Sequence, residues 1–210
     1  MMKILKYGNE LAKTVLIQPV DENDLKGIEE ELAYINDKYN GDYLLLAFII
    51  NKWNDELSPW KAMGAFKGQD FGSGANDTLN EILKYCNDNN KKYYIGGYSL
   101  AALFALWASY KTDVFSGVAC ASPSMWFSSF IDYMKDNKIK CNNVYLSIGD
   151  KESQTGNRVL KLLCEKTNEG YRILKDNNVN CILEINEGNH FKDTAIRTAK
   201  AFVWVLNNSQ

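Results

Sequence analysis

Short apolar runs alternate along the chain with longer segments in which apolar residues recur every three or four positions. The clearest run, residues 43–50, contains no charged or amide side chain, which is typical of a strand that is buried on both faces. Upstream of it, residues 24–38 carry Leu25, Ile28, Leu32 and Ile35 at helical spacing. The chain therefore predicts strands and helices in alternation.

The same patterns predict six strands, at residues 14–18, 43–50, 92–97, 114–121, 143–148 and 180–185. Helices are expected at residues 24–38, 100–110, 129–138, 157–177 and 192–207, and one more from a cap at Asn76 or Asp77 to Cys86. This alternation implies the α/β class, with a mostly parallel central sheet of about six or more strands and helices on both faces. Active sites of such sheets lie at the carboxyl ends of the strands, so the loops that follow each strand are where chemistry is expected.

Length and composition narrow the function classes. The 210 residues are 46% hydrophobic, and we expect a single domain over residues 1–210. The net charge is −2 and charges of both signs are mixed, so no nucleic-acid partner is expected. No apolar run has the length of a membrane span and no secretory signal is evident, so we expect a cytoplasmic protein without membrane contact. Five cysteines without a Cys-x-x-Cys pair read as free thiols, and a single histidine argues against a zinc site, so neither metal nor cofactor is expected.

The segment Gly97-Tyr98-Ser99-Leu100-Ala101 joins an apolar strand directly to an Ala/Leu-rich helix. A nucleophile elbow needs this context, with small residues two positions before and after the serine. In that interpretation Ser99 is the nucleophile and the Leu100 N–H is an oxyanion donor at a helix N-terminus. The alternative is that Ser99 merely caps the helix.

The only histidine, His190, lies in the loop between the last predicted strand and the last helix. In a serine hydrolase of this fold the general base follows the acid in the chain and occupies that loop. A lone histidine is more often a surface or structural residue, but its position here favours the base. The loop after the intervening strand carries Asp150 and Glu152, of which one would be the acid; otherwise both are ordinary solvated turn residues.

Together these loops resemble the α/β-hydrolase superfamily, and within it the esterases related to enterochelin (siderophore) and feruloyl esterases. The resemblance is carried by residues 97–101, 121–127 (Ala-Ser-Pro-Ser-Met-Trp-Phe), 149–152 and 188–191. It implies that the acid is Glu152, with Asp150 as the alternative. It also implies that a second oxyanion donor follows the strand at residues 14–18, as the backbone N–H of Val20 or Asp21. Asp21 has the alternative role of capping the next helix.

Aromatic side chains fall in the loops on the same side of the predicted sheet. Trp53, Trp126 and Phe127 are candidate substrate-binding residues, and the alternative is that they only pack these loops onto the domain. The sequence thus predicts a serine esterase with a small-molecule ester substrate. An acyltransferase, a small-peptide hydrolase and a non-catalytic binding module on the same scaffold are the competing hypotheses.

Overall fold

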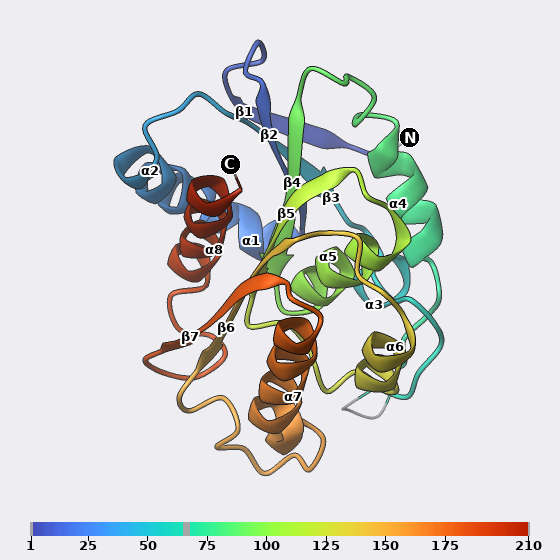
Figure 1. The fold of residues 1–210 in the computed structure, drawn as a ribbon. Coiled ribbons are helices and arrows are strands. Elements are labelled where there is room, and N and C mark those ends of the chain that lie inside the picture. Colours follow the sequence, from blue (N-terminus) through green and yellow to red (C-terminus); the bar gives the residue numbers. More distant parts are fainter. Residues whose placement is uncertain (1, 65–67, 210) are drawn as a thin grey trace.

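The structure is a computed structural model that describes residues 2–64 and 68–209. Its centre is a seven-stranded sheet in the order β1-β3-β2-β4-β5-β6-β7 (Figure 1). The strands are β1 (Ile4–Gly8), β2 (Thr14–Val20), β3 (Leu44–Ile49), β4 (Lys92–Tyr98), β5 (Phe115–Ala121), β6 (Asn143–Gly149) and β7 (Asn180–Asn186). All neighbours are parallel except β1 and β3. The predicted mostly parallel α/β sheet is confirmed, and all six predicted strands are present.

The seventh strand, β1, was not predicted. It is a short edge strand that pairs antiparallel with β3, and its side chains are half-buried or exposed. A five-residue strand with polar residues inside it lacks the long apolar run that marks the central strands. Its position is decided by pairing with a partner about 40 residues away, which sequence periodicity does not report.

Helices cover both faces of the sheet (Figure 1). The helices are α1 (Glu22–Lys26), α2 (Ile28–Lys38), α3 (Trp53–Glu56), α4 (Ala75–Leu83), α5 (Leu100–Lys111), α6 (Phe130–Asp136), α7 (Leu163–Asp176) and α8 (Thr194–Asn208), with a 3-10 turn at Leu160–Leu162. Helices α2 and α8 pack together on one face, and α4 to α7 lie over the other. The loops at the carboxyl ends of the parallel strands are thereby gathered at one edge of the sheet.

The bounds of every predicted helix shift by one or more residues in the structure, and three of these differences have a local explanation. The helix expected over 24–38 is divided at Gly27, where an added Cβ would lie 2.8 Å from the Ala195 Cβ of α8. The helix expected from Asn76 or Asp77 begins at Ala75 after Gly74. The helix expected from residue 157 is preceded by a turn, in which the Asn157 side chain accepts from the Val159 N–H at 2.9 Å.

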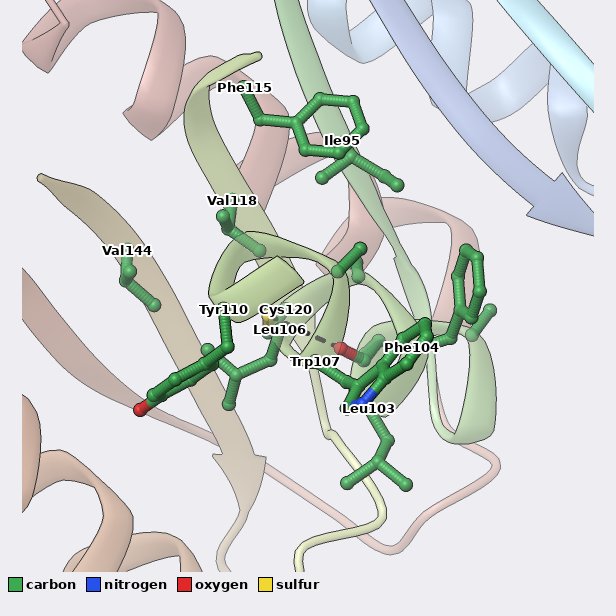
Figure 2. Close-up of a cluster of buried hydrophobic side chains, with 14 of the residues drawn as sticks. Ile95, Leu103, Phe104, Leu106, Trp107, Tyr110, Phe115, Val118, Cys120 and Val144 are labelled. Atoms are coloured by element: carbon green, nitrogen blue, oxygen red, sulfur yellow. Dashed lines mark hydrogen bonds between the residues drawn. The ribbon is translucent and has the colours of Figure 1, made fainter. Parts of the chain in front are cut away.

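Helix α5 is buried on every side and fixes the geometry of the segment before it. Every residue from Leu100 to Tyr110 is buried, and Figure 2 shows Leu103, Leu106 and other α5 side chains against those of β4, β5 and β6. The Cys120 thiol of β5 donates to the Ala102 carbonyl at 3.4 Å (Figure 2). The first turn of α5 is therefore held against the sheet at the point where the predicted elbow lies.

The five cysteines are all free, and three of them are buried. Burial raises the pKa of the Cys86 thiol to about 12 and that of the Cys141 thiol to about 11, so these thiols are packing residues. Among the described residues no helix combines the length and the apolar character needed to cross a membrane.

A buried carboxyl group joins α2 to β2 on the face of the sheet that α2 and α8 cover. Glu31 is 2% exposed, and its Oε2 accepts from the Gln18 side-chain amide at 3.2 Å. Glu31 Oε1 and Gln18 Oε1 are both buried without a hydrogen-bond partner among the described residues. Burial raises the pKa of Glu31 from 4.5 to about 8, although the Gln18 bond opposes this. The folded protein therefore keeps Glu31 neutral near pH 7.

We expect Glu31→Gln to stabilise the protein at alkaline pH. The raised pKa of Glu31 means that its contribution to stability is complete below pH 4.5 and is lost as the pH rises through about 8. A neutral amide does not have this dependence, so the free energy of unfolding should rise by roughly 4 kcal/mol at pH 8 and by less than about 1 kcal/mol at pH 5. Urea unfolding at both pH values measures it. Glu30→Gln, an exposed change in the same helix, is the control, and equal pH profiles for the two variants would contradict the assignment.

Candidate active site

Ser99 occupies a sharp turn between β4 and α5. Its φ of 56° and ψ of −114° are a conformation that a non-glycine residue rarely adopts. An added Cβ at Gly97 would lie 2.8 Å from the Ala101 Cβ, which is the steric reason for small residues on both sides of the serine. The hydroxyl makes no helix-capping hydrogen bond. The side chain of Ser99 therefore does not cap the helix, contrary to the alternative interpretation.

His190 lies between the Ser99 hydroxyl and a carboxylate. Its Nε2 is 3.0 Å from Ser99 Oγ, and its Nδ1 is 2.6 Å from Glu152 Oε2. Since an ionised carboxylate can only accept, Nδ1–H donates to Glu152 and Nε2 is left to accept the proton of Ser99. The loop that carries the imidazole is fixed by the Tyr98 hydroxyl, which donates to the His190 carbonyl at 2.8 Å.

Glu152 is held on both carboxylate oxygens. Its side chain is fully buried, and Oε1 accepts from the Gly149 N–H at 2.6 Å, the Ser122 hydroxyl at 2.7 Å and the Arg197 guanidinium at 2.9 Å. Burial acts to raise the pKa of Glu152. The hydrogen bond and charge of His190, together with the hydrogen bonds from Ser122 and Gly149, outweigh burial and bring this pKa below its ordinary value. The Glu152 carboxylate is thus ionised near neutral pH.

The other candidate acid, Asp150, faces elsewhere. Its Oδ1 accepts from the Gly188 N–H at 2.7 Å, and its own N–H donates to the Asn186 carbonyl at 2.8 Å. Asp150 therefore joins its turn to the loop that carries His190, and the direct bond to the imidazole is made by Glu152.

Arg197 completes this buried network and was not recognised from the sequence. It is 1% exposed, and besides Glu152 it donates to the Glu187 carbonyl at 2.9 Å and the Tyr98 hydroxyl at 3.2 Å. A signal was available, because Arg197 stands four residues before Ala201 and eight before Val205, on the buried stripe of α8. A cation on an apolar stripe calls for a buried carboxylate partner.

Two serines of the loop after β5 were also missed. Ser122 has a φ of 44° and donates to Glu152, as described above. Ser124 donates its N–H to the Ser99 carbonyl at 3.1 Å, and its Oγ is 3.2 Å from Ser99 Oγ. Both belong to the Ser-Pro-Ser stretch on which the sequence resemblance rests. The sequence did not predict a hydrogen-bond partner for either hydroxyl.

The structure distinguishes among the predicted oxyanion donors. Leu100 is the first residue of α5, so its N–H has no partner within the helix. The proposal of Asp21 was wrong, because its N–H donates to the Asp24 carboxylate at 3.1 Å in a capping box that begins α1. Val20 ends β2 with a fully buried side chain. The role of its N–H as the second oxyanion donor stays a prediction.

A cavity of about 140 Å³ opens beside Ser99. Its lining consists of Trp53, Asn54, Gln69, Phe71, Ser99, Leu100, Ser124 and Trp126. The predicted binding residues Trp53 and Trp126 are among them. Phe127 is not, which corrects that prediction: it is 2% exposed and packs edge-on against Trp60 and Phe71, with ring centroids 5.6 and 5.1 Å apart. Phe71, Asn54 and Gln69 lie in the irregular stretch after β3, where no periodicity could assign them a direction.

Two other features bear on the chemistry. A larger hollow of about 620 Å³ beside α4 is lined by Asp55, Glu56, Asp77 and Glu81 among others, but by no residue of the Ser99 network. Within the described ranges, no group of three or more His, Cys, Asp or Glu side chains is arranged to hold a metal ion. The cavity at Ser99 is therefore the candidate active site, with a hydroxyl, a base and a buried carboxylate in line.

The sheet order, its antiparallel edge strand and the loops that present Ser99, Glu152 and His190 define the α/β-hydrolase class of fold. No protein-family model matches the chain, and no curated protein matches its sequence. Solved structures do match, and those named next are hydrolases.

An IroE-like serine hydrolase from Shewanella oneidensis superposes with a TM-score of 0.75 at 14% identity, over 96% of this chain and 74% of that one. The siderophore hydrolase EstA from Aspergillus nidulans gives 0.67 at 15% identity, over 100% of this chain and 91% of that one. The enterobactin esterase FES from Shigella flexneri superposes with a TM-score of 0.61 at 10% identity, over 97% of this chain and 54% of that one. At these identities the likeness establishes the fold, and the expected fold class is confirmed.

Proposed function

We propose that this protein is a serine hydrolase that cleaves carboxylic esters through an acyl-enzyme. The observation that carries the proposal is the position of His190, with Nε2 3.0 Å from Ser99 Oγ and Nδ1 2.6 Å from Glu152 Oε2. The likeness to structures described as esterases and siderophore hydrolases supports the same class.

In the proposed reaction Ser99 Oγ attacks the ester carbonyl carbon while His190 Nε2 takes the hydroxyl proton. The C–O bond to the alcohol then breaks, and His190 returns the proton to the leaving oxygen. Water repeats the two steps on the acyl-Ser99 ester, which releases the acid and restores the serine. Glu152 keeps the proton of the imidazole on Nδ1 and stabilises the cation that forms in each transition state.

The negative charge on the carbonyl oxygen needs donors that are already in place. The Leu100 N–H at the start of α5 is one, since it lies beside Ser99 at the positive end of a helix dipole. The Val20 N–H is proposed as the second. Loss of a single such donor costs about 10²–10³ in turnover in other serine hydrolases.

The siderophore chemistry named for two of the similar structures is not part of this proposal. Among the described residues, none that lines the cavity beside Ser99 is a lysine or arginine, whereas an iron-loaded siderophore is a large anion that needs cationic partners. Carboxylic esters of neutral compounds fit the site better.

The test is labelling with a fluorophosphonate, which reacts with activated serine hydroxyls. We expect one adduct per chain, mapped to Ser99 by mass spectrometry, and no adduct in Ser99→Ala. A panel of matched esters, amides and thioesters, with and without an alcohol acceptor, follows. Absence of labelling in folded protein near pH 8 would favour a binding module, and faster cleavage of amides than of activated esters would favour a peptidase.

A further inference from the structure

The cavity and the base both adjoin the proposed nucleophile, but the base does not line the cavity. Ser99, Leu100 and Ser124 belong to the lining, whereas His190 does not. Because the base must give its proton to the leaving oxygen, the alcohol of an ester has to lie on the side of His190. The group that remains on the carbonyl carbon is then directed into the cavity.

The size of the cavity limits that group. Its volume of about 140 Å³ is below the roughly 300–1,000 Å³ of pockets that bury drug-sized ligands. An apolar cavity of about 150 Å³ in another protein holds one benzene molecule, which has six carbon atoms. A substituent of about six non-hydrogen atoms therefore fills the space.

The lining also selects for neutrality. Leu100 and the aromatic rings of Trp53, Phe71 and Trp126 form its apolar part, and its polar side chains are amides and hydroxyls. In the part of the chain that the structure describes, no Asp, Glu, Lys or Arg side chain lines the cavity. A charged substituent would lose its water without gaining a partner of opposite charge, which is costly.

Phe71 lines the cavity and has little freedom to move. It is 9% exposed, and its ring lies 5.8 Å from that of Trp126 and 5.1 Å from that of Phe127. Its N–H donates to the Ala62 carbonyl at 2.9 Å, and the next residue, Gly72, donates to the Asn54 carbonyl at 2.9 Å. The ring is held both by aromatic neighbours and by its backbone, so a longer substituent would not displace it cheaply.

The side of His190 is open by comparison. The imidazole is 26% exposed, and the next residue, Phe191, is 85% exposed with its ring edge-on to the imidazole. The described residues leave the imidazole partly accessible, so the size of the alcohol should matter little.

We propose that the cavity is an acyl pocket that admits uncharged carbonyl substituents of up to about six non-hydrogen atoms, that Phe71 sets this limit, and that the alcohol is not selected by size. This inference rests on the proposed esterase function and specifies its substrates as esters of small neutral acids with varied alcohols.

The test compares kcat/KM for 4-nitrophenyl acetate, butyrate, hexanoate and decanoate. In the wild type we expect kcat/KM for decanoate to be at least about tenfold below that for butyrate, the discrimination that an apolar pocket of limited size gives. The half-ester of succinic acid should also be at least about tenfold below butyrate because of its charge. Phenyl and 2-naphthyl butyrate should differ by less than about fourfold, the effect of one buried methylene.

Phe71→Ala should open the far end of the pocket and raise the decanoate-to-butyrate ratio by about tenfold or more, and Phe71→Leu should raise it less. The matched control is Phe115→Leu, an equally buried phenylalanine at the amino end of β5, which should leave the ratio unchanged. If Phe71→Ala does not fold, Phe71→Leu and the wild-type series decide.

A wild type that prefers decanoate, or a folded Phe71→Ala with an unchanged ratio, would overturn the acyl pocket. Labelling at Ser99 separates this failure from that of the esterase proposal. An enzyme that is labelled at Ser99 and hydrolyses all four esters equally well loses only the acyl pocket. A folded protein that is neither labelled nor active loses both.

Discussion

Replacement of Ser99 by alanine is expected to lower kcat on an activated ester by about 10⁴–10⁶-fold, the loss seen when the nucleophile of a serine hydrolase is removed. The reason is geometric, since the elbow presents a single hydroxyl to His190 Nε2 at 3.0 Å. Leu100 and the cavity would still bind the ester, so the residual rate should remain above that in water and KM should change little.

The nearest alternative nucleophile makes this a sharp experiment. Ser124 Oγ lies 3.2 Å from Ser99 Oγ, but the structure gives it no bond to His190. Ser124→Ala should therefore cost less than about tenfold, the value of one ordinary hydrogen bond. Active-site titration with an ester that releases a chromophore measures both variants. A Ser99→Ala enzyme with a full burst, or a dead Ser124→Ala enzyme, would reverse the assignment.

The second large effect is expected from Glu152→Gln, which should lower kcat by about 10⁴-fold, as the matching amide substitution does in other triads. Oε1 of Glu152 accepts from Ser122, Gly149 and Arg197, so the oxygen of a glutamine must stay there. Its NH₂ group is then forced to face His190 Nδ1. The imidazole must accept that bond, which moves its proton to Nε2, and the base can no longer take a proton from Ser99.

Asp150→Asn is the matched control. An asparagine Oδ1 can still accept from the Gly188 N–H that Asp150 binds at 2.7 Å, so kcat should fall by less than about tenfold. Thermal unfolding of both variants separates catalysis from stability, because Glu152→Gln also leaves the buried Arg197 cation with a weaker partner. Loss of activity in Asp150→Asn with activity kept in Glu152→Gln would identify Asp150 as the acid.

Most of the sheet could be predicted from the sequence, and so could the positions of the loops that carry Ser99, Glu152 and His190, because both depend on local patterns. An uninterrupted apolar run such as residues 43–50 marks a central strand wherever it occurs. Parallel connections of one hand then bring the carboxyl ends of the strands to one edge. The edge strand β1 was missed because its short pattern of mixed apolar and polar residues does not by itself indicate a strand. It forms a strand by pairing with β3.

The contacts within the site were less predictable. The sequence offered Glu152 and Asp150 two residues apart in one turn, and the resemblance alone favoured Glu152. The structure shows why that residue meets the imidazole: its longer side chain turns inward to Gly149, while Asp150 faces Gly188. Asp21 was equally ambiguous, and its N–H is occupied by a cap that involves Asp24, three residues further along.

By itself, then, the sequence determined the class of fold and the chain order of serine, acid and histidine, since periodicity and strand-to-helix junctions are encoded in neighbouring residues. Only the tertiary structure decided that Arg197 is buried against Glu152, that Phe71 lines the cavity and that Phe127 packs against Phe71 instead of lining it. The physical reason is that hydrogen bonds and ring contacts depend on distances of a few ångströms between residues far apart in the chain. Such distances are fixed when the helices pack on the sheet, and no local pattern records them.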